Sequence, residues 1–314
     1  MATEPETGIL TVAAVRTPKG AEGAEVLFNE RHQIYTVRQT ARAAAASLDL
    51  LREAAGRNVP LRATLDPRRG LIARLESPSP AEVRKFTQER TLLDKPEKTY
   101  RIDVGEIDPT RFNLVDHYLK VPVFRLCKRV VPNYKKAKEI FDFCAQQSCH
   151  LGGPFGVTPC IPFQYVRDGC YARAHKMRWI ITTKYGYCCE KIFSFANQGD
   201  DVLAVQANKW GGCCVQWWYH VAPLIRVRVK LGAWSLTLAL VIDPGMFDKP
   251  VLASSWLAAQ ENTACSSRAN VSMYSIQPGT AYSPANFQGT AFTTDPNLAS
   301  TNGTLIAYSG LVTC

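Results

Sequence analysis

The chain has 314 residues, of which 46% are hydrophobic and 20% are charged, a composition that fits a globular protein of one large or two ordinary domains. No apolar run reaches the roughly 18–20 residues of a membrane-spanning helix, so we do not expect a membrane protein. The net charge is +10, but the basic run RVRVK alternates like a strand face and carries no interleaved aromatic residue. We therefore do not expect nucleic-acid binding.

Residues 1–125 contain no cysteine and are predicted to form a small α+β domain. Its expected elements, in chain order, are a strand at 33–37, a helix at 40–57, two strands within 59–76 and a helix that begins after residue 79. Ser79 as N-cap, Pro80 in the first turn and Glu82 in a capping box predict the start of that last helix. Two histidines of this domain, His32 and His117, have no catalytic neighbours in the sequence, so we expect no active site here.

Residues 126–314 are predicted to form a second domain that begins with two helices. The stretch PNYKKAKEIFDFCAQQ places apolar residues at helical spacing after Pro132. The next helix is expected from Asp168, as its N-cap, to about Tyr185, where Gly186 ends it. Strands are expected at 191–196, 201–207, 214–229 and 234–243, and the polar residues 250–314 are expected to be irregular with short strands. A helix followed by antiparallel strands predicts an α+β fold.

All eleven cysteines lie at or after Cys127. Ten of them could form five disulfides and leave one reactive thiol. An odd number of cysteines is expected of a protein from an oxidising compartment that has one reactive cysteine. We therefore expect a secreted protein, although the start of this chain has no recognisable signal peptide. The adjacent pairs Cys188–Cys189 and Cys213–Cys214 lack the two-residue gaps of zinc knuckles, so we expect disulfides there, and neither a metal nor a cofactor.

Cys170, in DGCYARAHKMR, is predicted to stand in the first turn of the second helix. Unpaired backbone N–H groups and the positive end of the helix dipole stabilise a thiolate at such a position and lower the pKa of its thiol. The same N–H groups can receive the oxyanion of a tetrahedral intermediate. Cys170 is therefore the predicted nucleophile, whereas His175 points to another helix face and is expected to be structural.

A nucleophilic cysteine needs a base and a group that orients the base. His220, in the strand WWYHVA, is the predicted base, and the large side chains of Trp217, Trp218 and Tyr219 are expected to wall the site and contact substrate. Asp243 ends an apolar strand, where a carboxylate is costly to bury without a partner, and it is the predicted orienting group.

Each of these three residues also has an ordinary structural interpretation. Cys170 could be half of a disulfide, His220 could be a hydrogen-bonded core histidine, and Asp243 before Pro244 and Gly245 could start a turn. Their coincidence in helix–strand–strand order favours the catalytic interpretation, because papain-like and transglutaminase-like sites are assembled in that way.

Four blocks of this sequence resemble the bacterial protein-glutaminase family, secreted enzymes that deamidate glutamine side chains within proteins. In chain order the blocks are PCIPFQYVRDGCYARAHKMRWI, GYCCEKIFSFAN, GGCCVQWWYHVAPLI and VIDPGMFDKPV. The N-terminal stretch LESPSPAEVRKF is similar to the pro-region of the same family. The resemblance implies a catalytic trio of Cys170, His220 and Asp243 on a transglutaminase-like core, with exposed glutamines of proteins as substrates.

The resemblance also implies a zymogen, in which residues 1–125 form an inhibitory pro-domain and residues 126–314 form the catalytic domain. We expect the pro-domain to lie across the active-site cleft until an activating protease cuts near LKVPVFRLCKRV, residues 119–130. Most cysteines fall where the family has them, but Cys127, Cys144 and Cys188 are additions, so the resemblance does not imply the complete disulfide pairing.

Three other functions would use the same residues or the same cysteine count. A transglutaminase would resolve the thioester with a lysine amine instead of water, and a cysteine protease would cleave backbone. In a disulfide-rich secreted binding module without catalysis, Cys170 would be in its oxidised form. Deamidation of protein-bound glutamine is the function that the sequence favours.

Overall fold

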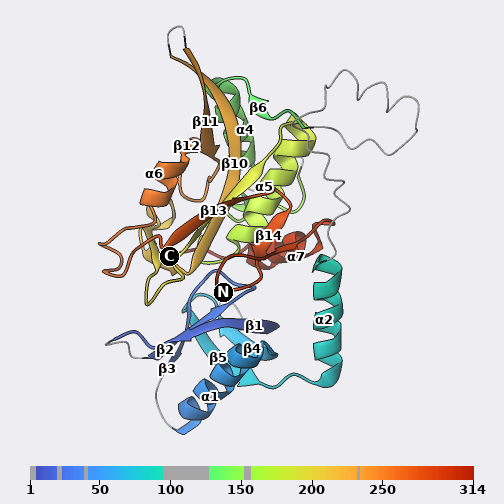
Figure 1. Cartoon of the computed structure of the whole chain (residues 1–314), viewed down its shortest axis with the longest axis vertical. Coiled ribbons are helices and arrows are strands. Elements are labelled where there is room, and N and C mark those ends of the chain that lie inside the picture. Colours follow the sequence, from blue (N-terminus) through green and yellow to red (C-terminus); the bar gives the residue numbers. More distant parts are fainter. Residues whose placement is uncertain (1–4, 20–22, 39–41, 95–126, 152–156, 232–233) are drawn as a thin grey trace, which may run out of the picture.

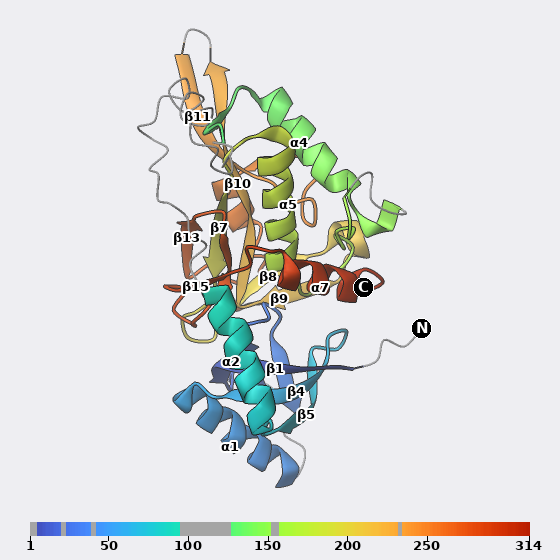
Figure 2. The ribbon, with the colours of Figure 1, turned by 90° about the vertical axis from the view of Figure 1, so that its right-hand side faces the viewer.

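The computed structural model describes residues 5–19, 23–38, 42–94, 127–151, 157–231 and 234–314. A small N-terminal body and a larger C-terminal body lie one above the other, and the helix that ends the first body runs up towards the second (Figures 1 and 2). The predicted cut at 119–130 falls mostly outside the described residues, as does His117.

The N-terminal body is a closed barrel of strand order β1-β2-β3-β5-β4. Alternate apolar residues fill it, among them Leu10, Val26 and Leu61, as the two-residue period of strands requires. The capping box is confirmed, because the backbone N–H and the hydroxyl of Ser79 both bind the Glu82 carboxylate. The elements are β1 (Glu6–Arg16), β2 (Gly23–Phe28), β3 (Tyr35–Arg38), α1 (Arg42–Arg57), β4 (Pro60–Asp66), β5 (Leu71–Glu76) and α2 (Pro80–Asp94).

The C-terminal body is built on a sheet of order β12-β11-β10-β7-β13, with β6 beside β10. All its neighbouring pairs are antiparallel except β6 with β10. The strands are β6 (Val130–Val131), β7 (Glu190–Phe195), β10 (Tyr219–Leu231), β11 (Trp234–Val241), β12 (Val251–Leu252) and β13 (Met273–Gln277). Separate pairs are β8 (Leu203–Gln206) with β9 (Cys214–Trp217), and β14 (Ala281–Pro284) with β15 (Phe292–Thr294).

Both predicted helices of this body are present. Asn133 caps α4 (Tyr134–Gln146) by accepting a hydrogen bond from the Lys136 N–H, and Gly186 in the left-handed region ends α5 (Cys170–Tyr185). Helix α5 packs on β10 and on α4, so the cysteine-bearing helix lies against the antiparallel sheet. The expected α+β fold is confirmed.

Residues 250–314 were expected to be irregular with short strands; the short strands β12 to β15 are present, but the region also contains two helices that were not expected. These helices are α6 (Ala253–Ala258) and α7 (Ala299–Tyr308), the second packed against α5. Serine, threonine, asparagine and glycine lower the helix propensity of ASTNGTLIAY, but burial of Leu305 and Tyr308 against the core outweighs propensity.

Four disulfides form, not the five expected from parity. They are Cys127–Cys188, Cys149–Cys160, Cys213–Cys314 and Cys214–Cys265. Three buried cysteines remain free, Cys144, Cys170 and Cys189. Of the three cysteines expected to be additions, Cys127 and Cys188 pair with each other, whereas Cys144 is a free thiol in the core.

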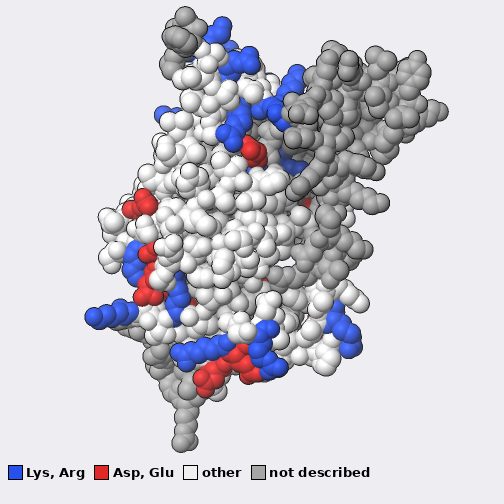
Figure 3. Space-filling view, viewed as in Figure 1, with Lys and Arg blue, Asp and Glu red and all other residues white. Residues whose placement is uncertain are grey.

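On the face shown in Figure 3, charged side chains lie in the upper part, along the left edge and at the lower end, and each of these groups contains both signs. The net charge of +10 thus does not collect in one basic surface on this face. Among the described residues, no helix combines the length and apolar character needed to cross a membrane.

Candidate active site

The N-terminus of α5 places Cys170 at the junction of the two bodies. Gly169 precedes it with φ +83, in the left-handed region that favours glycine, and an added Cβ would lie 2.9 Å from the Tyr308 ring. Gly169 is the N-cap, so the prediction that Asp168 caps this helix was wrong. The Asp168 carboxylate instead faces His32 of the N-terminal body, and it also accepts hydrogen bonds from the Gly169 N–H and the Tyr308 hydroxyl.

Strands β10 and β11 bring His220 and Asp243 together. Their antiparallel register pairs Leu224 with Val241, so continuing it sets position 243 opposite position 222, two residues from His220 and on the same face. His220 Nε2 lies 2.9 Å from Asp243 Oδ2, and both side chains are buried.

The Asp243 carboxylate is held ionised by its donors. Burial acts to raise its pKa, but the hydrogen bond and charge of His220 and the Trp256 indole N–H, 2.9 Å from Oδ2, outweigh burial and lower the pKa. An ionised carboxylate only accepts, so His220 carries its proton on Nε2 and presents the lone pair of Nδ1. Burial lowers the pKa of His220 and keeps the ring neutral.

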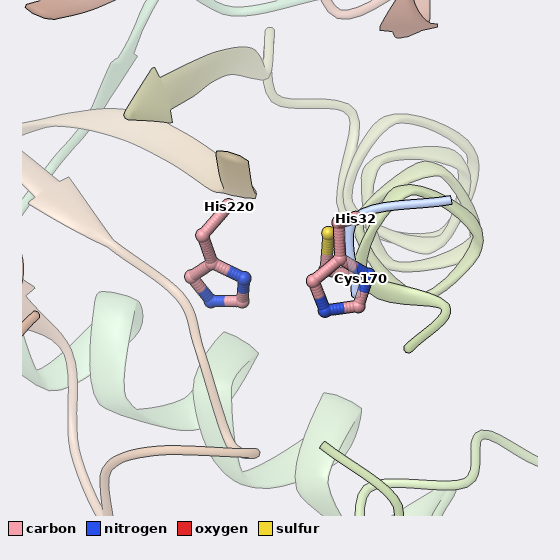
Figure 4. A group of neighbouring side chains, drawn as sticks. All are labelled: His32, Cys170 and His220. Carbon is pink, nitrogen blue, oxygen red and sulfur yellow. The ribbon is translucent and has the colours of Figure 1, made fainter. Parts of the chain in front are cut away.

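Cys170 and His220 share a three-residue cluster with His32 of the N-terminal body. Cys170 Sγ and one nitrogen of each ring all lie within 4.8 Å of one another. Figure 4 shows the three side chains reaching this point from separate elements: the loop after β2, the start of α5 and the start of β10. Burial raises the pKa of the Cys170 thiol, against the lowering expected from the helix terminus, because desolvation outweighs the lowering by the Arg173 charge and the Val221 backbone N–H.

His32 is the site residue that sequence reasoning missed. Its Nδ1 lies 2.7 Å from Asp168 Oδ1, and its ring packs against Trp217 and Tyr219. The ring is fully buried, and burial lowers its pKa to about 4 despite the Asp168 carboxylate. No sequence signal marks His32, since its neighbours come from a different body.

Residues 28–33, which we call the cleft segment, bind the backbone and side chains of the predicted aromatic wall. The Trp218 N–H donates to the His32 carbonyl, its indole N–H donates to the Arg31 carbonyl, and Gln33 forms an isolated antiparallel bridge with Trp217. Arg31 also donates to the Tyr171 hydroxyl and lies 3.5 Å from the Asp168 carboxylate.

The three predicted wall residues take different places. Trp217 stacks on His220, with ring centroids 4.5 Å apart, and donates its indole N–H to the Val166 carbonyl. Tyr219 packs against His32, and Trp218 faces the cleft segment. His175, as expected, is structural: it is buried and hydrogen bonds the Asp295 carbonyl.

The known proteins that this chain resembles are glutaminases. A protein-family model described as glutaminase matches residues 137–260. A crystal structure of pro-protein-glutaminase is 29% identical with a TM-score of 0.71, and the match covers 99% of this chain and 95% of that one. A crystal structure of a mutant of pro-protein-glutaminase is 30% identical with a TM-score of 0.71, and the match again covers 99% of this chain and 95% of that one. A search of curated proteins found no match.

Two structures of protein-glutaminase match a smaller share of this chain. A crystal structure of protein-glutaminase is 37% identical, with a TM-score of 0.50, and the match covers 60% of this chain and 92% of that one. The solution structure of protein-glutaminase from Chryseobacterium proteolyticum is also 37% identical, with a TM-score of 0.50, and covers 59% and 91% respectively.

Proposed function

Because this chain belongs to the protein-glutaminase family, we propose that it is a latent hydrolase that converts glutamine side chains of proteins to glutamate and ammonia. The observation that carries the proposal is the meeting of Cys170 with the hydrogen-bonded His220–Asp243 pair at the start of α5. That arrangement supplies a nucleophile, a base and an orienting carboxylate.

In the first half-reaction, Cys170 loses its proton to His220 Nδ1, and the thiolate attacks the side-chain amide carbon of glutamine. The C=O π electrons move to the oxygen, and backbone N–H groups at the start of α5 are suited to receive that oxyanion. His220 then gives the proton to the departing nitrogen, the C–N bond breaks, and ammonia leaves a thioester on Cys170. Asp243 keeps the imidazole in the required tautomer throughout.

In the second half-reaction, water attacks the thioester carbon while His220 takes one of its protons. The C–S bond breaks, the sulfur recovers a proton, and glutamate is released. A lysine amine in place of this water would give the cross-link of a transglutaminase. Trp217, Trp218 and Tyr219 are proposed to contact the substrate once the cleft segment has left.

Latency follows from what the cleft segment occupies. The segment pairs with the strand backbone next to His220, in the manner of an added peptide strand, and buries Cys170 beneath His32. A glutamine-bearing protein must take this same place. We propose that residues 1–125 are the pro-domain, that residues 126–314 are the enzyme, and that an activating protease cuts within 119–130.

Four disulfides favour an oxidising compartment, and on that basis we propose that the protein is secreted.

The test compares ammonia release from a glutamine-rich protein by the wild type and by Cys170→Ser, each before and after limited proteolysis. The cut wild type is expected to release ammonia and to leave only amide-to-acid mass changes in the substrate. Cys170→Ser is expected to lose at least about 10³-fold in rate, as nucleophile removal does in other hydrolases.

Cys144→Ser is the matched control, because it removes another buried free thiol away from the cluster, and it should retain activity. Equal ammonia release by wild type and Cys170→Ser would remove Cys170 from the mechanism. Cross-linked chains or cleaved backbone as the main product would replace deamidation by one of the alternative reactions.

A further inference from the structure

The cluster of His32, Cys170 and His220 has the donor set of a zinc site. Zinc binds thiolate sulfur and imidazole nitrogen, and three such ligands plus one open position form a common coordination shell. Tetrahedral coordination with the usual bond lengths puts ligand atoms about 3.3–3.7 Å apart. The ligand atoms here already lie within 4.8 Å of one another, so small side-chain movements would complete the shell.

Both imidazoles have one nitrogen engaged and one nitrogen free. His32 Nδ1 and His220 Nε2 face the carboxylates of Asp168 and Asp243, at 2.7 and 2.9 Å. The other nitrogens, His32 Nε2 and His220 Nδ1, are buried without a hydrogen-bond partner among the described residues. A carboxylate behind each histidine is the usual outer support of a metal-binding imidazole, since it fixes the ring and makes it a better ligand.

We propose that the latent protein binds one zinc ion through His32 Nε2, Cys170 Sγ and His220 Nδ1. The ion replaces the thiol proton, which leaves to solvent, and the sulfur becomes a metal-bound thiolate. Asp168 and Asp243 supply negative charge behind the two rings. A cavity of about 630 Å³ is lined by Arg31 and Tyr171, the sequence neighbours of His32 and Cys170, whereas the three ligands themselves are buried.

A bound ion would strengthen latency in two ways. It would hold the Cys170 sulfur as a ligand, unable to attack an amide, and it would join the N-terminal body to the enzyme through His32. Departure of the N-terminal body would take away one of three ligands, so the ion would then be held weakly. The site thus belongs to the latent form and is not a cofactor site of the reaction.

The experiment titrates the uncut, chelator-stripped chain with cobalt(II) and then with zinc, without thiol reductants. We expect about one cobalt per chain, with the near-ultraviolet thiolate-to-cobalt band and the visible bands of four-coordinate cobalt, both abolished when zinc displaces it. His32→Gln should weaken binding by more than 100-fold, and Asp168→Asn by about 10–100-fold through its support of His32. Cys170→Ser should lose the thiolate band.

Two matched controls should bind like the wild type: His150→Gln, which replaces an exposed histidine, and Cys144→Ser. A second readout is the rate at which iodoacetamide labels the Cys170 peptide of the uncut chain, which one equivalent of zinc should slow at least about ten-fold. Absence of stoichiometric metal, or binding that survives His32→Gln in a folded protein, would overturn the proposal. Neither readout needs deamidation, so failure of the proposed function would leave this result standing.

Discussion

At the scale of single residues, Trp256 is a positioning residue that sequence reasoning did not find. Its indole N–H donates to Asp243 Oδ2, and its ring stacks on His220 with centroids 5.3 Å apart. It therefore touches both His220 and Asp243, the pair proposed to present Nδ1 to Cys170. The residue comes from the short helix α6, in a region where the sequence predicted only strands and irregular chain.

Replacing Trp256 by phenylalanine keeps an aromatic ring on His220 and removes one donor from Asp243. A hydrogen bond to a charged group contributes about 1.5–3 kcal/mol, so we expect kcat of the cut enzyme to fall about 10–100-fold with little change in KM. Trp179→Phe is the control, because Trp179 is partly exposed on α5 and its loss should leave kcat unchanged. An unaltered kcat in Trp256→Phe would show that His220 alone positions Asp243.

The residues that could be predicted from the sequence carry local signals. Cys170 follows a glycine at a helix start, Asp243 is a lone acid after an apolar strand, and His220 sits in an aromatic strand. His32 and Trp256 carry no such signal, because their roles arise only when distant elements pack together. Asp168 had a signal, for an N-cap, but the carboxylate found stronger partners in His32 and Arg31.

At the scale of elements, α5 begins and ends with a glycine in the left-handed region, and the two differ in surroundings. Gly186 has open space where a Cβ would stand, whereas at Gly169 a Cβ would meet the Tyr308 ring of α7. The close approach is what lets Tyr308 reach the Asp168 carboxylate. The first glycine therefore positions Cys170, the proposed nucleophile, and the second only ends the helix.

Alanine at each glycine separates these two roles. Gly186→Ala should cost about 1 kcal/mol of stability, the conformational cost of a positive φ alone, and leave activity unchanged. Gly169→Ala adds a steric clash and should cost about 2–3 kcal/mol while lowering kcat of the cut enzyme. Thermal unfolding and ammonia release measure both, and equal effects of the two variants would mean that the Tyr308 contact is unimportant.

The contact of α5 with β7 predicts a pH dependence of stability. His175 Nδ1 lies 2.7 Å from Lys191 Nζ, and burial together with the Lys191 charge lowers the pKa of His175 to about 2. The unfolded chain, with a histidine pKa near 6.5, therefore binds this proton first as the pH falls. The native state loses about 1.4 kcal/mol per pH unit below about 6.5, or about 2 kcal/mol by pH 5.

His175→Asn removes the titrating group and should reduce the fall in Tm between pH 7 and pH 5. His150 is exposed, so the Tm of His150→Asn should fall between pH 7 and pH 5 as much as that of the wild type. A His175→Asn protein whose Tm falls as steeply as the wild type would place the acid sensitivity elsewhere.

At the scale of the whole molecule, a second contact joins the two bodies away from the active site. Glu25 of β2 forms two ion pairs. Its Oε2 lies 2.9 Å from Arg16 Nη2 within the barrel, and its Oε1 lies 2.5 Å from Arg268 Nη2 of the C-terminal body. Arg16 also donates to the Asp201 carbonyl of that body, 2.7 Å. Sequence reasoning predicted that the N-terminal domain covers the site, but not this contact, because neither residue has a motif and the pair exists only after docking.

Glu25→Gln should loosen this contact without touching the active site. A charged hydrogen bond in a mostly buried setting contributes about 1.5–3 kcal/mol, so the cleft segment should leave Cys170 at least about ten-fold more often. The measurement is the ammonia-release rate of the uncut chain, which should rise by that factor. The predicted cut separates Glu25 from the catalytic part of the chain, so the cut variant should release ammonia at the same rate as the cut wild type.

Two further variants decide whether the interface contact is responsible. Arg268→Ala removes the same pair from the other side, so it should raise uncut activity similarly even if Glu25→Gln disturbed the barrel. Glu53→Gln breaks an exposed pair with Arg57 inside α1, where such a pair contributes little, and it should change nothing. If uncut activity stays at the wild-type level in both interface variants, latency does not depend on this ion pair. The remaining contacts between the bodies, among them the cleft segment and the hydrogen bond from the Tyr165 hydroxyl to the Pro67 carbonyl, are then sufficient to hold them together.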